Sequence, residues 1–139
     1  MPLTPLVSTA SNPAKKTSSS LDLLEDLAVV ISSDTLVEVV VFGNIKYQKS
    51  IIHIINSHAT KSLIYNIFAT NDYNSGTYPT FNATTTWKQL LTSDKTLSAV
   101  TNDAETLTDD WSWIIIAMKR GVAGAGNDST AKVRIRARK

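Results

Sequence analysis

The stretch TAKVRIRARK, residues 130–139, decides the fold because basic and apolar residues alternate along it. The basic side chains occupy the even positions: Lys132, Arg134, Arg136 and Arg138. The apolar side chains occupy the odd positions between them: Val133, Ile135 and Ala137. Side chains two residues apart share a face of a β-strand, so the pattern predicts a final strand with one face in a core and a basic face outside. A disordered nucleic-acid-binding tail is usually dense in basic residues with little apolar content, and the pattern disfavours that interpretation.

The same two-residue period recurs upstream. It is clearest in WSWIIIAMKRG, residues 111–121, where Ile114, Ile116 and Met118 share one face. The opposite face of this segment carries Trp111, Trp113, Ile115 and Ala117. Further strands are predicted within the ranges 36–43, 50–56, 62–70, 87–91 and 95–100.

The connections between these strands are predicted from local composition. Five residues separate SIIHIIN from SLIYNIFAT, which favours a hairpin at 57–61. The glycine-rich stretch VAGAGNDS, residues 122–129, is predicted to be a turn before the last strand, and GVAGAG, residues 121–126, favours a flexible hairpin turn. The acid-rich segment 101–110 is interpreted as a polar connection, and 21–32 as a short turn of helix that leads into a strand.

About eight short strands separated by turn signals predict an all-β protein, an antiparallel β-sandwich or jelly-roll-like fold. At 139 residues the chain has the length of one domain. Residues 1–20 contain three prolines and a Ser/Thr-rich end, so they are predicted to be an extended N-terminal arm. Residues 21–139 are predicted to form the single sandwich domain. The arm has three apolar residues that could anchor it on a neighbouring subunit: Leu3, Leu6 and Val7.

Charge is spread unevenly along the chain. Residues 119–139 hold seven basic residues and one acidic residue, whereas residues 1–118 hold seven basic and eleven acidic residues. An acidic body with a basic end can pair with copies of itself. The acids that could compensate the basic row are Asp22, Glu25, Asp26, Asp103, Glu105, Asp109 and Asp110, in the same chain or the next.

No catalytic, cofactor or metal residue is predicted. The chain has no cysteine, so thiol catalysis, disulfides and cysteine-based zinc sites are excluded. His53 and His58 are five residues apart across a strand end and do not form a ligand pair. No serine lies in a GxSxG motif. The three glycines of residues 121–126 follow a strand and precede another, and so lack the helix that a phosphate-binding loop requires.

Four aromatic residues lie in or near the polar loop 71–86: Tyr73, Tyr78, Phe81 and Trp87. Such rings could stack on a sugar or a base. The favoured interpretation is that they plug one end of the sandwich or an interface between subunits. No secretory signal or membrane-spanning stretch is recognisable, so we expect no membrane association.

The order of segments resembles a family of known proteins. In chain order these segments are a polar arm, SIIHIINSHATKSLIYNIFATND, WKQLLTSDKTL, DDWSWIIIAMKRG, a glycine turn and a basic last strand. This order resembles that of small β-sandwich structural proteins of tailed bacterial and archaeal viruses. Those proteins decorate or cement the capsid, or build the tail. The resemblance implies a non-enzymatic protein located in the virion and assembled in the host cytoplasm. Its implied partners are copies of itself, as a trimer or other homo-oligomer, and capsid or tail proteins.

Two other function classes remain open from the sequence. A carbohydrate-binding sandwich would use the four aromatic residues above to bind a glycan. A nucleic-acid-binding barrel would use the terminal basic row, although the alternation argues against it.

Overall fold

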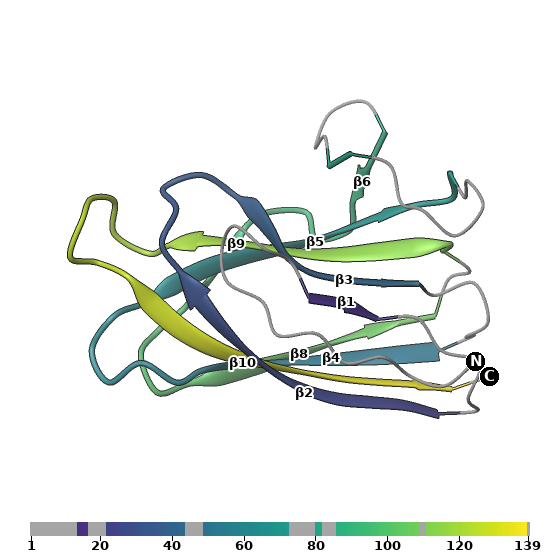
Figure 1. The fold of residues 1–139 in the computed structure, drawn as a ribbon, viewed down its shortest axis with the longest axis horizontal. Coiled ribbons are helices and arrows are strands. Elements are labelled where there is room, and N and C mark those ends of the chain that lie inside the picture. Colours follow the sequence, from purple (N-terminus) through teal and green to yellow (C-terminus); the bar gives the residue numbers. More distant parts are fainter. Residues whose placement is uncertain are drawn as a thin grey trace.

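The computed structural model describes residues 14–16, 22–43, 49–72, 80–81, 86–108 and 111–138. These residues form strands and connecting loops without a helix, and the strands lie in two facing layers (Figure 1). The predicted all-β antiparallel sandwich is therefore confirmed. In the part of the chain that is described, no helical segment has the length and apolar character needed to cross a membrane.

One layer, which we call sheet I, has the order β1-β3-β9-β5-β6, and β7 pairs with β5 beside β6. Its strands are β1 (Ala14–Lys16), β3 (Val37–Gly43), β5 (Leu63–Thr70), β6 (Lys88–Gln89), β7 (Lys95–Leu97) and β9 (Trp113–Arg120). All of its pairs are antiparallel except β1 with β3. β1 lies within the segment predicted to be an extended arm, and the remainder of that segment is outside the described residues.

The other layer, sheet II, has the order β2-β10-β4-β8. Its strands are β2 (Asp22–Ile31), β4 (Lys49–Asn56), β8 (Asn102–Leu107) and β10 (Ser129–Arg138). β10 lies between β2 and β4 and pairs with β2 along all ten of its residues. The C-terminal strand is therefore an interior strand of its sheet.

The alternation along β10 is confirmed. Its odd positions are buried against sheet I: Ala131, Val133, Ile135 and Ala137. Its even positions Lys132, Arg134 and Arg136 are exposed on the outer face of sheet II. The apolar and charged parities of the sequence thus correspond to the inside and the outside of the sandwich.

The chain changes sheet at almost every connection, so both predicted hairpins are wrong. β4 lies in sheet II and β5 in sheet I, and the same holds for β10 and β9. A short polar or glycine-rich gap is compatible with a turn within a sheet and with a crossing between two sheets. Spacing alone does not separate these cases.

The helical turn predicted at the start of residues 21–32 and the polar connection predicted at 101–110 are also wrong, whereas the strand predicted at the end of 21–32 is confirmed. Residues 22–31 form strand along their whole length, because ten register pairs with β10 override the helical spacing of the leucines. Residues 102–107, predicted as a polar connection, form the edge strand β8, which pairs with β4. β8 alternates exposed and half-buried residues, yet its half-buried positions include Asp103 and Glu105, so the apolar signal of a strand is missing.

Sheet I is buried on both faces. Its inner face carries Ile114, Ile116 and Met118 of β9, and its outer face carries Trp113 and Ile115. The register of β3 shifts between Glu38 and Val40, a β-bulge that places both Val39 and Val40 in the main core. This bulge interrupts the regular alternation predicted for residues 37–42.

Neighbouring β10 residues lie on a buried and an exposed face, so their substitution should change the free energy of unfolding by different amounts. Ile135→Ala removes fully buried apolar volume and is expected to lower the free energy of unfolding by about 3 kcal/mol. Arg136→Ala, its matched control on the outer face, is expected to change it by less than about 0.5 kcal/mol. Urea denaturation followed by circular dichroism gives both values. Equal losses in the two variants would show that β10 does not have one buried face.

Candidate functional site

The outer face of sheet II is an open surface with a basic row along its centre. Next to Lys132, Arg134 and Arg136, strand β4 presents Lys49 and Ile51, both exposed. Ile51 is 39% exposed, and Val30 of the other neighbouring strand is 44% exposed. Among the described outward side chains of β4, β8 and β10 none is acidic. The face therefore combines positive charge with accessible apolar surface.

The register shows which predicted acids lie near the basic row. Asp26 on β2 is the register partner of Arg134, and Asp22 is the partner of Arg138. Asp103 and Glu105 occupy the half-buried positions of β8, which face the other sheet. Asp109 and Asp110 lie outside the described residues, and Glu25 is paired in register with Ile135. Among the predicted acids whose backbone the structure describes, Asp22 and Asp26 are the ones at register positions directly beside basic residues of the row.

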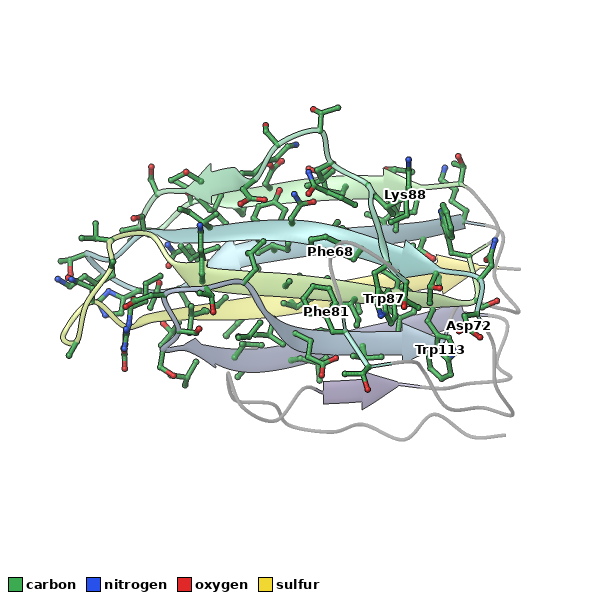
Figure 2. All side chains as sticks on the ribbon, turned by 90° about the horizontal axis from the view of Figure 1, so that it is seen from above. Phe68, Asp72, Phe81, Trp87, Lys88 and Trp113 are labelled. Atoms are coloured by element: carbon green, nitrogen blue, oxygen red, sulfur yellow. The ribbon has the colours of Figure 1, made fainter. Side chains whose placement is uncertain are left out.

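The predicted aromatic residues lie on the outer face of sheet I where the structure describes them. Phe81 packs edge-on against Phe68 with ring centroids 4.9 Å apart, and against Trp87 at 6.2 Å. Figure 2 shows these rings over the sheet, with Trp113 near its end. Trp87 is 4% exposed, and its Nε1 donates a hydrogen bond to the Thr80 carbonyl. These rings therefore form a second small core that covers the sheet.

Five predicted site residues cannot be placed. Leu3, Leu6 and Val7 of the arm, and Tyr73 and Tyr78 of the aromatic loop, lie outside the described residues. The backbone of Arg138 is described as the end of β10. The structure thus brings together the described members of the basic row on one face and Phe81 with Trp87 on the other.

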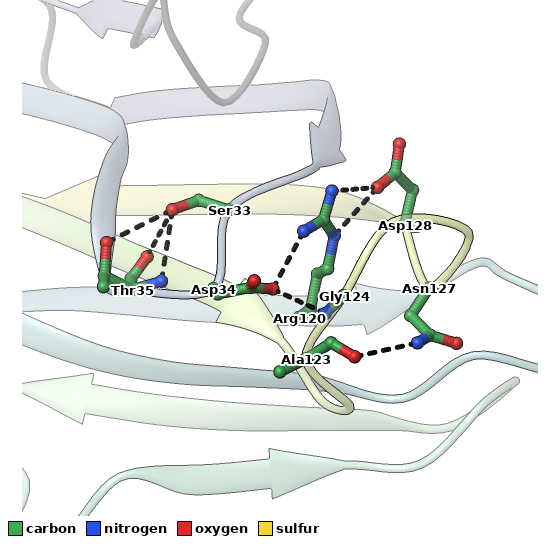
Figure 3. Close-up of polar contacts among 8 residues, drawn as sticks. All are labelled: Ser33, Asp34, Thr35, Arg120, Ala123, Gly124, Asn127 and Asp128. Atoms are coloured by element: carbon green, nitrogen blue, oxygen red, sulfur yellow. Dashed lines mark hydrogen bonds and ion pairs between the residues drawn. The ribbon is translucent and has the colours of Figure 1, made fainter.

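One end of the sandwich holds an ion-paired group of loops (Figure 3). Arg120, at the end of β9, binds Asp34 through Nη1 at 2.8 Å and Asp128 through Nε and Nη2 at 2.9 and 2.8 Å. The amide of Gly124 also donates to Asp34 Oδ1 at 3.0 Å. The hydrogen bond from Arg120 lowers the pKa of the Asp34 carboxyl. Arg120 thereby joins the β2–β3 loop to the β9–β10 loop.

Asn56 joins further loops at the same end. Its side chain is buried, and Nδ2 donates to the carbonyls of Lys61 at 2.8 Å and Leu97 at 3.1 Å. Its Oδ1 accepts from the His58 amide at 3.0 Å and lies 3.3 Å from Ser129 Oγ. Both donors and both acceptor positions of the amide are therefore used. One side chain of sheet II thus fixes the β4–β5 loop and a strand of sheet I.

These loops surround a cavity of about 310 Å³. Its lining comes from three connections, β4–β5, β7–β8 and β9–β10, and consists of Thr60, Lys61, Ser62, Ser98, Ala99, Val122 and Asn127. Lys61 Nζ donates to Asn127 Oδ1 at 3.0 Å across it. The cavity thus combines polar groups with apolar surface, and its loops are held by hydrogen bonds.

A polar network closes one side of the sandwich between β7 and β8. The Tyr65 hydroxyl donates toward Asp103 at 2.9 Å and Glu105 at 3.1 Å, and Lys95 binds Glu105. Burial and the two carboxylates raise the pKa of Tyr65, so the phenol stays protonated. The hydrogen bond from Tyr65 lowers the pKa of Asp103. The network joins the edges of the two sheets.

Sequence reasoning missed Asn56 and Arg120. Asn56 shares the inward parity of Ile52 and Ile54, and a polar residue at the inward end of a buried strand is a signal that could have identified it. Arg120 acts through Asp34, which is 86 residues away, and no local pattern reports that pairing.

No family model matches the chain, and no curated protein matches it in sequence. Two solved structures have a similar arrangement of strands. The mitogen YPM of Yersinia pseudotuberculosis gives a TM-score of 0.48 at 9% identity, covering 81% of this chain and 84% of that chain. A protein from Bacillus endospore appendages, described as a novel family of disulfide-linked pili, gives 0.46 at 9% identity, covering 87% and 91%. At this level of identity neither likeness assigns a function.

The Asn56 side chain gives a testable stability difference. Asn56→Ala removes the Asn56 donor from the Leu97 carbonyl and leaves the Lys61 carbonyl with the Ser129 hydroxyl alone, and we expect a loss of about 2 kcal/mol in the free energy of unfolding. Asn102→Ala, an exposed asparagine of β8 that contacts His53, serves as the control with an expected change below about 0.5 kcal/mol. Chemical denaturation measures both. A small loss for Asn56→Ala would mean that the loops are held without it.

The Tyr65 network predicts a pH-dependent effect. The folded-state pKa of Asp103 is lowered, so the ionised carboxylate stabilises the folded protein. This stabilisation is fully present above the ordinary pKa of an aspartate and is lost as the pH falls through the folded-state pKa of Asp103. Tyr65→Phe removes the donor that causes this shift and is expected to cost about 1 kcal/mol at pH 7. The difference from wild type should narrow below about pH 4, as the carboxyls become protonated. Thermal unfolding across pH tests this, and a penalty independent of pH would contradict it.

Proposed function

We propose that this chain is a non-enzymatic structural protein of a virion, which decorates or cements the capsid through the outer face of sheet II. The observation that carries the proposal is the composition of that face. Lys132, Arg134 and Arg136 form an exposed row on an interior strand, beside the accessible apolar side chains Ile51 and Val30.

This composition suits a protein partner with acidic groups. Positive charge steers the approach of an acidic surface, and the apolar side chains gain free energy when the interface excludes water. A sheet face also offers a backbone held by hydrogen bonds between strands, so little conformational entropy is lost on contact. On a capsid each such contact is repeated many times, so a modest interface per copy suffices to reinforce the shell.

Contacts between copies form the second part of the proposal. The excess of basic residues at the C-terminal end and of acidic residues elsewhere favours association of the chain with itself, as a trimer or another homo-oligomer. In the described part, Asp34 and Asp128 are already paired with Arg120 within the chain. The basic face is the surface that we assign to the capsid, or to a tail protein of the particle, and acidic groups of a neighbouring copy are a second partner for the same charges.

A carbohydrate-binding module is the second candidate. The described aromatic side chains do not favour it at the predicted place, because Trp87 is buried and Phe81 packs against Phe68 and Trp87. A glycan-binding role would need another location on the molecule.

The location of the protein is tested by immunogold electron microscopy of particles released from cells that express the chain. The proposal expects gold on the particle surface. Gold on cell debris with unlabelled particles would contradict it.

The role of the face is tested by adding purified protein back to particles stripped of it. The double variant Arg134→Glu and Arg136→Glu reverses two outward charges and is expected to bind at least about tenfold more weakly than wild type. Lys88→Glu, an exposed lysine on β6 of sheet I, is the matched control and should bind like wild type. If the double variant binds as well as the control, the outer face of sheet II is not the contact surface. Steeply salt-dependent binding of plain duplex DNA would instead point to a nucleic-acid role.

A further inference from the structure

The cavity at the loop end is built from three connections that are far apart in the sequence. Thr60, Lys61 and Ser62 come from the β4–β5 loop, and Ser98 with Ala99 from the β7–β8 loop. The β9–β10 loop adds Val122 and Asn127. Its volume of about 310 Å³ lies at the small end of the range for ligand pockets.

The walls of this cavity are fixed before any ligand arrives. Asn56 donates to the Lys61 carbonyl. Arg120 binds Asp128 near the end of the β9–β10 loop and also binds Asp34, which in turn accepts the amide of Gly124 in the middle of that loop. Gly121 lies directly against Ser62, whose carbonyl accepts its amide at 3.1 Å, and a Cβ at position 121 would come within 1.9 Å of Ser62 Oγ. A preformed site loses little entropy when it binds a small molecule.

The chemistry of the lining selects a class of ligand. Lys61 supplies one ammonium, which uses one of its three N–H donors on Asn127 Oδ1 and keeps others for an anion. Thr60, Ser62 and Ser98 add hydroxyl groups that can both donate and accept hydrogen bonds. No lining residue is acidic, so a negatively charged ligand meets no repulsion from the wall.

The apolar part of the lining completes the pattern. Val122 is 61% exposed, although it is a large apolar side chain, and Ala99 lies in the same lining. Together they offer a small apolar surface beside the hydroxyl groups. A sugar ring has the matching character, because it presents C–H groups on its face and hydroxyl groups at its edge.

We propose that this cavity binds a hydroxylated small molecule that carries one carboxylate, of the kind found as an acidic sugar at the end of a glycan. Lys61 binds the carboxylate, the Ser and Thr hydroxyls bind the sugar hydroxyls, and Val122 covers the ring face. The inference is independent of the proposed role in a virion. It also places a glycan site at the loop end, away from the aromatic cluster on sheet I.

The test is a titration of the ¹⁵N-labelled full chain with glucuronic acid, with glucose and acetate as matched probes that lack the carboxylate or the ring. We expect the amide signals of residues 60–62, 98–99 and 121–127 to shift with glucuronic acid. Glucose and acetate should bind distinctly more weakly. Lys61→Gln should weaken glucuronic acid binding about tenfold, because it removes a charged hydrogen-bond donor.

Two further variants keep the test decisive. Val122→Glu places a negative charge at an exposed position of the lining, where folding is not at stake, and should abolish binding of glucuronic acid. Lys88→Gln removes an exposed lysine that is not part of the lining and should leave binding unchanged. Absence of shifts with glucuronic acid, shifts outside the three loops, equal binding of acetate, or equal affinity of Lys61→Gln would each overturn the proposal.

Discussion

The structure depends on the position of β10 as an interior strand whose two faces have opposite character. A slip of one residue against either neighbour would turn every side chain to the other face, and would bury Arg134 and Arg136 in the core. Burying unpaired guanidinium groups is far too costly for a small domain to tolerate. The register of sheet II is therefore set strongly, and β2 and β4 follow from it through their long pairings with β10. The basic outer face follows from the same constraint. Because the charged side chains of β10 cannot be buried in the core, they lie on the exposed face of sheet II.

The sequence predicts this part of the fold well because the information is local. Alternation of apolar and basic residues identified β10 and the face on which each of its side chains lies, and apolar segments with a two-residue period identified β5 and β9. β8 lacks an apolar face, so its residues showed no apolar alternation and were predicted to be a polar connection. The helical spacing of the leucines in β2 was overridden by pairing with a strand more than a hundred residues away, which no local pattern records.

Connections and site residues were harder to predict for a related reason. A short gap between strands does not say whether the next strand joins the same sheet, and here most connections cross between sheets. Asn56 and Arg120 act through partners that only the folded chain brings near, so their roles emerge from three-dimensional proximity. Phe81 and Trp87 were predicted either to stack on a ligand or to cover an end of the sandwich or an interface. They lie on the outer face of sheet I, and this environment depends on packing with Phe68 and Trp113, which the sequence does not reveal.

The molecule thus has two surfaces of different character, and each carries one of the two proposals. The face of sheet II is basic and partly apolar, which suits the protein contact that we propose for it. The loop end contains a cavity with polar and apolar lining whose loops are held by Asn56 and Arg120, which suits the small-ligand site that we propose there. Both rest on a sandwich whose described polar networks lie at its margins, while its interior is packed with aliphatic and aromatic side chains.

The most direct measurement is the reactivity of single cysteines introduced along β10. The natural chain has no cysteine, so each variant reports one position without background. Cysteines at 132, 134 and 136 should react rapidly with a thiol reagent, and those at 133 and 135 should react only when the protein unfolds. Equal reactivity along the strand, or fast reaction at the odd positions, would contradict the two-faced strand on which the fold and its basic surface depend.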